Sequence, residues 1–119
     1  MTYDTYDVVV VPFPFTDRST SKRRPALVLS DSEVFDRAVS HSVLAMITSR
    51  TNAPWPLDIP IEDLDAAGLP APSMVRMKLF TLDHTLILRK AGRLVLEDRQ
   101  NVRAALAHLL RFATPDLLK

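Results

Sequence analysis

Four valines in succession, Val8–Val11, constrain the fold of this chain more than any other feature. β-Branched residues favour strands, and an unbroken apolar run fits a strand that is buried on both faces. Pro12 and Pro14 follow, and because proline cannot donate to a sheet ladder, the strand should bend or fray there. A polar loop then leads to a second apolar run, Ala26–Ser30, so the two runs read as a hairpin-like pair of strands.

Further short strands alternate with turn residues along the rest of the chain. We expect these strands at Val43–Thr48, Leu57–Ile59, Ser73–Met77 and Leu79–Leu82. Thr85–Arg89 fits either a strand or a tight turn, and Gly92 should let the chain reverse before Leu94. Short strands of this kind predict a mainly β (α+β) fold, a small antiparallel barrel-like sheet.

Two helical segments are expected. Glu62–Ala67 should form a helical turn that stops at Gly68, because glycine suits a helix C-cap. A longer terminal helix should run from about Asp98 to Phe112, where Pro115 ends it. The apolar face of that helix is given by Val102, Leu106, Leu109 and Leu110.

Length and composition predict one soluble domain over residues 1–119. The chain has no cysteine, so it has neither disulfides nor thiolate metal ligands, which suits a reducing cytosol. We see no signal peptide at the start and no apolar run long enough for a membrane span. The net charge is only +1, so any case for nucleic acid rests on where the charges lie.

The loop between the first two strands concentrates positive charge. Its cations are Arg18, Lys22, Arg23 and Arg24, interleaved with the hydroxyls of Ser19, Thr20 and Ser21. Four cations on one loop repel each other unless an anion binds, and a phosphate backbone is the usual anion. Acidic residues instead collect in 58–65 and 97–98, a distribution that fits an enzyme releasing its nucleic acid.

The usual acid–base side chains do not form an obvious constellation. His41, His84 and His108 are scattered along the chain, and a structural role is favoured for each. The acidic cluster at 62–65 fits a solvated face. No spacing of ligands suggests a metal site.

Arg24 and Thr48 are the best candidates for chemistry. Pro25 restrains the backbone of Arg24 where a wet loop enters a buried strand, and a guanidinium can fork onto two phosphate oxygens. From the residues alone, a surface salt bridge to Asp17 is equally possible. Thr48 ends an apolar strand, where its hydroxyl could donate to a phosphate with help from Ser49, although capping a turn is the commoner role.

Other residues would suit a groove that follows a nucleic-acid backbone. These are Lys22, Arg23, Arg50, Arg76 and Lys78. Trp55 or Phe80 could stack a base, but the alternation around Phe80 favours core packing. Trp55, between two prolines, fits base stacking and the cover of a dimer seam about equally.

Motifs along nearly the whole chain resemble one known family. They are PFPFTD (12–17), RRPALVLS (23–30), LAMITS (44–49), WPLDIPI (55–61), SMVRMKLFTLD (73–83) and the closing helix. In this order they are similar to the MazF/PemK family of type II toxin–antitoxin endoribonuclease toxins. The resemblance implies an SH3-like, CcdB/MazF-type barrel, a homodimer, a cytoplasmic location, an antitoxin on a separate chain, and no cofactor or metal.

The resemblance also implies an activity and its residues. Such enzymes cleave single-stranded RNA by attack of a 2′-hydroxyl, leaving a 2′,3′-cyclic phosphate and a 5′-hydroxyl. Arg24 falls on the family's catalytic arginine and Thr48 on its catalytic strand-end threonine. RNA-binding roles are expected for Asp17, Arg18, Ser19, Lys22, Arg23, Ser49, Arg50, Trp55, Arg76 and Lys78. Because arginine holds its proton tightly, we assign Arg24 to charge stabilisation before proton transfer.

The chain departs from the family in two places. Ser19–Ser21 replaces the acidic-glutamine loop of many members, so the cleaved sequence cannot be carried over. Tyr6 stands where glycine commonly precedes Asp7, which we interpret as a backbone detail.

Two other functions fit the same fold. One is a toxin that binds and poisons a DNA topoisomerase without cutting anything; it would tolerate loss of Arg24 and depend on the terminal helix. The other is a regulator that binds nucleic acid and has no activity; its binding would be salt-sensitive and would create no new RNA ends.

Overall fold

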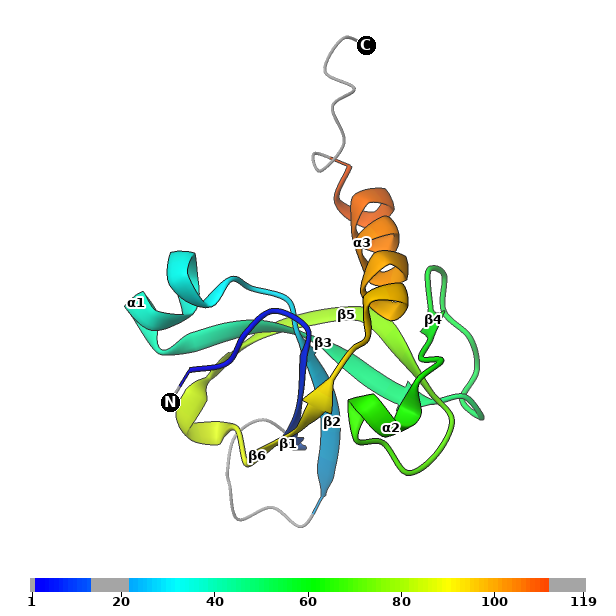
Figure 1. Ribbon diagram of the computed structural model, residues 1–119, viewed down its shortest axis with the longest axis horizontal. Coiled ribbons are helices and arrows are strands. Elements are labelled where there is room, and N and C mark those ends of the chain that lie inside the picture. Colours follow the sequence, from blue (N-terminus) through cyan, green and yellow to red (C-terminus); the bar gives the residue numbers. More distant parts are fainter. Residues whose placement is uncertain (1, 14–21, 112–119) are drawn as a thin grey trace, which may run out of the picture.

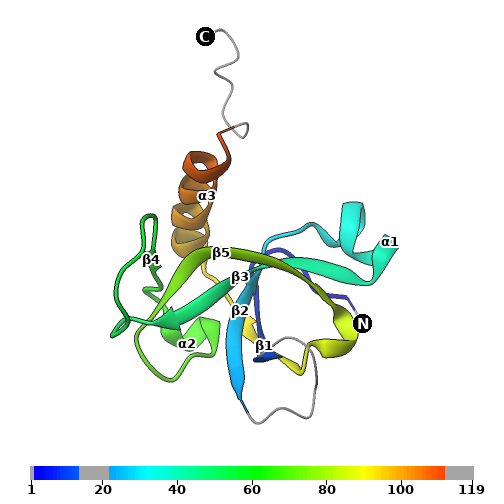
Figure 2. The same cartoon turned by 180° about the vertical axis from the view of Figure 1, so that it is seen from behind.

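Six antiparallel strands form a single curled sheet in the computed structural model, which describes residues 2–13 and 22–111. The sheet order is β4-β5-β3-β2-β1-β6, and the sheet curls into a half-barrel (Figure 1 and Figure 2). The strands are β1 (Asp7–Pro12), β2 (Arg23–Val28), β3 (His41–Ser49), β4 (Ile59–Pro60), β5 (Ser73–Asp83) and β6 (Arg89–Arg93). The expected mainly β fold with a helix at its C-terminal end is confirmed.

Helical segments connect and cover the strands. They are a π-helical turn at Ser32–Asp36, α1 (Arg37–Val39), α2 (Leu64–Ala67), a 3₁₀ turn at His84–Leu86, and α3 (Leu96–Leu110). The sequence did not indicate the helical segment over 32–39. The described residues include no helix that is long and apolar enough to cross a membrane.

Several strand boundaries differ from expectation. The two runs expected on either side of Lys78 belong to one strand, β5, whose register with β3 shifts there: Ala45 pairs with Leu79 and Met46 with Arg76, so the strand is irregular at Lys78 but does not end. Leu57 lies in a turn before β4, with a φ of 68°. The sequence of Thr85–Arg89 fits either a strand or a tight turn. In the structure its first residues lie in the 3₁₀ turn, and β6 begins at Arg89.

Apolar side chains are buried on both faces of the sheet. On the face covered by α3, Leu27, Ala45 and Ile47 pack with Val102 of the helix. On the other face, Val9, Val11, Val28 and Leu44 pack with Tyr3 of the N-terminal segment. Burial on two sides explains why β1 is an unbroken run of valines, since its side chains have no solvent face to fill.

Gly92 does not reverse the chain. It lies inside β6, where α2 crosses so closely that a Cβ on Gly92 would stand 2.3 Å from the Ala66 carbonyl oxygen. Gly68 has the C-cap role expected for it, with a φ of 72° and its N–H bonded to the Asp65 carbonyl. A Cβ on Gly68 would in turn meet the Ala91 carbonyl at 2.1 Å. The two glycines therefore serve one close contact between α2 and β6.

The apolar face expected for the terminal helix is only partly correct. Val102 is buried and Leu106 packs against the core, but Leu109 and Leu110 each leave 39 % of their surface exposed. The C-terminal half of α3 projects away from the sheet, so residues 2–13 and 22–111 offer those leucines no surface to pack on (Figure 1).

The residue before β1 has an uncommon backbone conformation. Tyr6 has a φ of 75°, in the left-handed region that favours glycine. Its ring lies beside the guanidinium of Arg99 on α3, whose Cζ is 5.7 Å from the ring centroid. The tyrosine therefore tolerates a strained backbone and contributes packing that glycine would lack.

Candidate functional site

Arg24 and Thr48 face each other at the open end of the sheet. The last printed pair of the β2–β3 ladder joins Ala26 to Met46, and Arg24 and Thr48 each lie two residues beyond it, where the two strands border common hollows. Both side chains line the same two hollows, one of about 150 Å³ and one of about 270 Å³. Neighbouring strands thus bring the two residues that the sequence singled out to the same hollows, although 24 positions separate them.

Arg24 is held against an aromatic ring. Its Cζ atom lies 5.1 Å from the centroid of the Phe13 ring, and Pro25 restrains its backbone on the other side. Among the described residues, no carboxylate forms an ion pair with it. Asp17, the alternative partner considered above, lies outside the described residues. Stacking on Phe13 leaves the edge of the guanidinium available to an anion.

Thr48 is oriented by a residue four positions later. The Asn52 side-chain amide donates to Thr48 Oγ1, and Ser49 Oγ lies 2.9 Å from Thr51 Oγ1. Because Asn52 supplies the donor, the Thr48 hydroxyl keeps its own proton for an acceptor in the hollow. The strand end therefore presents a hydroxyl donor beside the guanidinium of Arg24.

Arg76 is engaged within the chain. Its Nε and Nη2 atoms donate to the two carboxylate oxygens of Asp58, at 3.2 and 3.0 Å, and Nη2 also donates to the Ala53 carbonyl at 2.8 Å. The guanidinium also lies over the indole of Trp55, with Cζ 4.9 Å from the ring centroid. Arg76 therefore ties the loop before β4 to β5.

The pKa of Asp58 reflects this engagement. Burial opposes its charged form, but the hydrogen bonds from Arg76 and from the Trp55 backbone N–H, with the charge of Arg76, outweigh burial and lower the pKa below the usual aspartate value. Asp58 thus stays ionised and paired at neutral pH.

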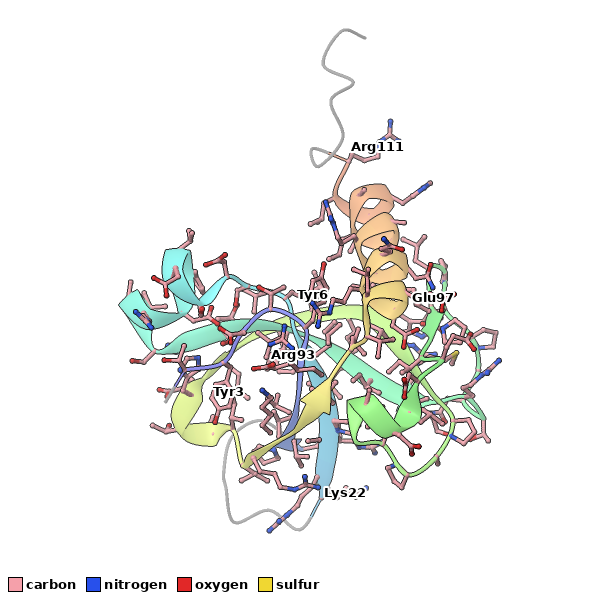
Figure 3. All side chains as sticks on the ribbon, in the orientation of Figure 1. Tyr3, Tyr6, Lys22, Arg93, Glu97 and Arg111 are labelled. Carbon is pink, nitrogen blue, oxygen red and sulfur yellow. The ribbon has the colours of Figure 1, made fainter. Side chains whose placement is uncertain are left out.

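The remaining predicted RNA-binding residues divide into four groups. Lys78 lines the smaller hollow with Arg24 and Thr48, and its Nζ lies 6.0 Å from the Trp55 ring centroid. Arg23 and Ser49 line the larger hollow. Lys22, at the tip of β2 (Figure 3), and Arg50, just after β3, are exposed and line neither hollow. Asp17, Arg18 and Ser19 lie outside the described residues.

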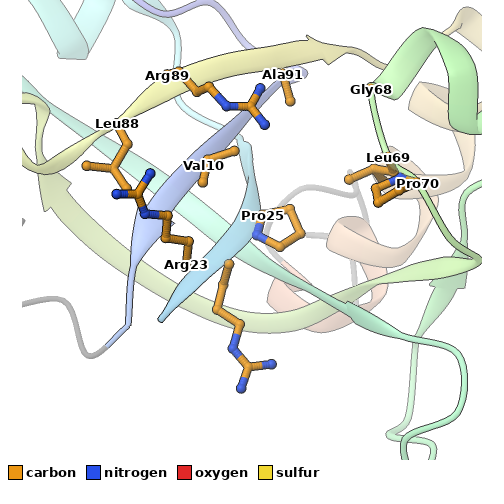
Figure 4. Close-up of a pocket in the computed structure, with 10 residues that line it drawn as sticks. Val10, Arg23, Pro25, Gly68, Leu69, Pro70, Leu88, Arg89 and Ala91 are labelled. Atoms are coloured by element: carbon orange, nitrogen blue, oxygen red, sulfur yellow. The ribbon is translucent and has the colours of Figure 1, made fainter. Parts of the chain in front are cut away.

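A third hollow of about 310 Å³ adjoins the same end of β2. Arg23, Arg24 and Arg89 line it over an apolar floor that includes Val10 and Pro25. In Figure 4, Leu69 and Pro70 stand across from Val10 and Arg89. Arg24 contributes to all three hollows, so it stands where they meet.

The three histidines stay apart from this site. His84 Nε2 bonds Ser42 Oγ at 2.8 Å, and that hydroxyl donates to the buried carboxylate of Asp36. His41 bonds the Val39 carbonyl through Nδ1, and His108 is exposed on α3. Within the part of the chain that the structure describes, no cluster of three or more His, Cys, Asp or Glu residues could hold a metal ion.

Three residues near Arg24 and Thr48 were missed as contributors to the site. Phe13 supports Arg24, Asn52 orients Thr48, and Asp58 pairs with Arg76. Asn52 could have been suspected, since an amide in the turn after a strand can bond back to the strand end. Nothing in the sequence links Asp58 to Arg76, which is 18 positions away.

Comparison with known proteins identifies the same fold elsewhere. Residues 4–110 match the family model described as the PemK-like, MazF-like toxin of type II toxin–antitoxin systems. No protein sequence of curated function matches the chain.

Solved structures with the same fold include three from bacteria. The MazE–MazF complex of Deinococcus radiodurans superposes with a TM-score of 0.70 at 20% identity, over 92% of this chain and 96% of that one. An endoribonuclease in complex with its cognate antitoxin from a mycobacterial species gives 0.70 at 15% identity, over 92% and 93%. The Mycobacterium tuberculosis toxin MazF-mt6 gives 0.68 at 20% identity, over 88% and 96%.

Proposed function

The chain belongs to the PemK-like, MazF-like toxin family of type II toxin–antitoxin systems, and from that premise we propose that it is an endoribonuclease that cleaves single-stranded RNA without a metal. The observation that carries the proposal is that Arg24 of β2 and Thr48 of β3 line the same two hollows. A guanidinium with no carboxylate partner among the described residues and an oriented hydroxyl line one hollow. A phosphate is the group that both would bind.

The reaction is a transesterification within the RNA. The 2′-oxygen of one nucleotide forms a bond to the adjacent phosphorus, and the bond from phosphorus to the 5′-oxygen of the next nucleotide breaks. The 2′-hydroxyl loses a proton and the departing 5′-oxygen gains one, so the products are a 2′,3′-cyclic phosphate and a 5′-hydroxyl. No water or cofactor is consumed in this step.

Arg24 stabilises the negative charge that builds on the phosphate oxygens when the phosphorus becomes pentacoordinate. Its fork of N–H groups can meet two phosphate oxygens, and a bond that strengthens in the transition state lowers the barrier. Thr48 donates its hydroxyl proton to a phosphate oxygen, with Asn52 fixing its direction. Because a guanidinium holds its proton tightly, we assign proton transfer to Arg24 only as a secondary role.

Other residues would hold the RNA on either side of the cut. Lys78 stands in the hollow with Arg24, and Arg23 and Ser49 stand in the adjoining hollow. We extend the RNA path to Lys22, Arg50 and Trp55, with Arg76 lying over the Trp55 ring, and to Asp17, Arg18 and Ser19. Two of the similar structures contain an antitoxin, which supports a separate antitoxin chain as the partner here. We further propose a homodimer in the cytoplasm.

The test is incubation of the purified protein with a long single-stranded RNA in EDTA, followed by mapping of every new 5′ end. We expect discrete cuts with 5′-hydroxyl ends, abolished by a single 2′-deoxy substitution at the scissile nucleotide. An Arg37→Ala variant is a matched control, because that arginine is exposed on α1 and lines none of the three hollows. RNA that stays intact across many sequences would contradict the proposal and favour the topoisomerase poison or the inactive RNA binder.

A further inference from the structure

The loop before β4 carries the single tryptophan of the chain at the edge of the candidate site. Trp55 leaves 44% of its surface exposed, although a side chain of its size is usually covered. Exposure of one aromatic residue needs no explanation by itself. What sets Trp55 apart is that neighbouring side chains hold it in place.

Asp58 fixes the loop that presents the indole. Its carboxylate accepts the Trp55 backbone N–H at 2.8 Å, and the Asp58 backbone N–H donates to the Trp55 carbonyl at 3.3 Å. Leu57 between them takes a φ of 68°, a left-handed conformation that is unfavourable for a residue with a Cβ. The turn therefore persists because both the N–H and the carbonyl of Trp55 are hydrogen-bonded to Asp58.

Arg76 fixes the ring itself. Its guanidinium lies over the indole while Asp58 and the Ala53 carbonyl take its hydrogen bonds. The side chains of Arg76 and Asp58 are almost covered, at 11% and 7% exposure. A cation that is already neutralised and buried is a poor ligand for a phosphate, because binding would require it to give up a bidentate partner.

The ring stands next to the hollow that holds Arg24 and Thr48. Arg76 and Lys78 both line that hollow, and both lie within 6.0 Å of the Trp55 ring centroid. A nucleic-acid strand whose phosphate sits at Arg24 would carry a neighbouring base towards this indole. Stacking on an aromatic face suits single strands, since unstacked bases have a π-face to offer.

We propose that Trp55 is a stacking platform for one base of a single-stranded RNA, and that Arg76 and Asp58 are positioning residues that hold the platform rather than contacts to the RNA backbone. This inference rests on the proposed function for the location of the phosphate. It assigns Arg76 a different role from the phosphate contact expected from the sequence, while Lys78 remains the cation that meets the strand.

The test uses the fluorescence of the full-length protein, because its only tryptophan is Trp55. The probe is a labelled single strand of about 12 nucleotides, a length within the range that such sites cover. It carries the mapped cleavage sequence with deoxyribose at the scissile nucleotide; without mapped cuts, a random-sequence RNA pool of the same length replaces it. We expect Trp55 emission to be quenched with the same midpoint as the rise in anisotropy of the label.

Variants separate stacking from phosphate contact. Trp55→Phe should bind within about threefold of wild type and Trp55→Ala about tenfold more weakly, with KM changed and kcat nearly unchanged. Lys78→Gln should lower the slope of log affinity against log salt by about 0.7, whereas Arg76→Gln should leave that slope unchanged and shift Trp55 emission in the free protein. In the Trp55→Ala background, Arg76→Gln should have little further effect on affinity.

Two results would overturn the inference. One is RNA binding by anisotropy with no change in Trp55 emission. The other is emission that depends on protein concentration and ignores RNA, which would place Trp55 in a seam between two copies. Neither result bears on the proposed RNA cleavage. If the protein cleaves RNA but Trp55 emission is not quenched, only the proposed stacking on Trp55 is refuted. A protein that shows quenching but no cleavage refutes the proposed activity and keeps the platform.

Discussion

Single residues at this site act through the partners that orient them. Arg24 stacks on Phe13, Thr48 accepts from Asn52, and Arg76 is held by Asp58. Each functional group is therefore positioned before any ligand binds, and a positioned group loses less conformational entropy on binding. The geometry of the guanidinium at position 24 should matter as much as its charge.

Arg24→Lys tests that statement. Lysine keeps the positive charge but cannot fork onto two phosphate oxygens, so we expect it to reduce kcat/KM nearly as much as Arg24→Ala does. Cleavage of the mapped RNA sequence by the two variants gives the comparison, and thermal unfolding checks that both are folded. Retention of most activity by the lysine variant would contradict the bidentate contact.

The acid range tests the Asp58–Arg76 pair. Because the pKa of Asp58 is lowered in the folded protein, the stabilisation is fully present above the unfolded-state value of about 3.9 and is lost only as the pH falls through the lower folded value. Trp55 emission should therefore be constant from about pH 7 to about pH 4 and change below it. Asp58→Asn should lack the transition, and circular dichroism separates it from global unfolding. A transition above about pH 5 would contradict the assignment.

At the scale of elements, the sheet positions the site and two close contacts hold its edges. One contact joins α2 to β6 through Gly68 and Gly92. The other joins the helical segment over 32–39 to β3, where the buried Asp36 carboxylate accepts from Ser30 Oγ at 2.5 Å and from Ser42 Oγ at 2.8 Å. Both contacts can be broken without touching the residues proposed for chemistry.

Gly92→Ala should destabilise the fold by about 2–3 kcal/mol, because the new methyl group would collide with the backbone of Ala66 and Ala67, which cannot rotate away. The free energy of unfolding in urea measures the loss. Thr81→Ala, at an exposed position on β5, is the control and should stay within about 0.5 kcal/mol of wild type. Equal stability of the two variants would show that α2 moves easily relative to β6.

Asp36→Ala should cost about 3 kcal/mol, because it leaves two hydroxyls, one of them fully buried, without their charged acceptor. Glu33→Ala is a matched control on the same segment, since its pair with Arg37 is exposed and contributes little. Chemical unfolding of both variants gives the comparison. A loss below about 1 kcal/mol for Asp36→Ala would mean that water replaces the carboxylate.

Local patterns in the sequence predicted most of the sheet, and contacts between distant residues explain what they missed. The valine run and the short apolar runs predict strands at the positions of β1, β3 and β5, because strands with a buried face have a recognisable pattern of apolar residues. The prediction that Gly92 reverses the chain was wrong. A glycine is needed at this position because α2 lies so close to β6, and the residues next to Gly92 in the sequence do not indicate that contact. For the same reason only the family resemblance implied that Arg24 and Thr48 share one site, and the contact of Asp58 with Arg76 was not expected at all.

At the scale of the whole molecule, charge is separated although the net charge is only +1. Arg23, Arg24 and Arg89 surround a hollow at one end of β2. A different hollow, beside α2 and the start of α3, is lined by Glu62, Asp63, Asp65 and Glu97. This distribution of charge attracts a nucleic-acid strand to the basic end of the protein and does not favour its binding to the rest of the surface. We therefore propose that the arginine-lined end of the protein is where RNA is cut.

The most direct measurement of that claim is single-turnover cleavage of the mapped RNA sequence in EDTA by wild type, Arg24→Ala and Thr48→Ala, each verified as folded and as binding the strand. The proposed mechanism predicts that wild type produces 5′-hydroxyl ends and that each variant is slower by about 10²–10³-fold, the usual effect of removing a group that stabilises transition-state charge. Cleavage by the folded Arg24→Ala variant at the wild-type rate would contradict it.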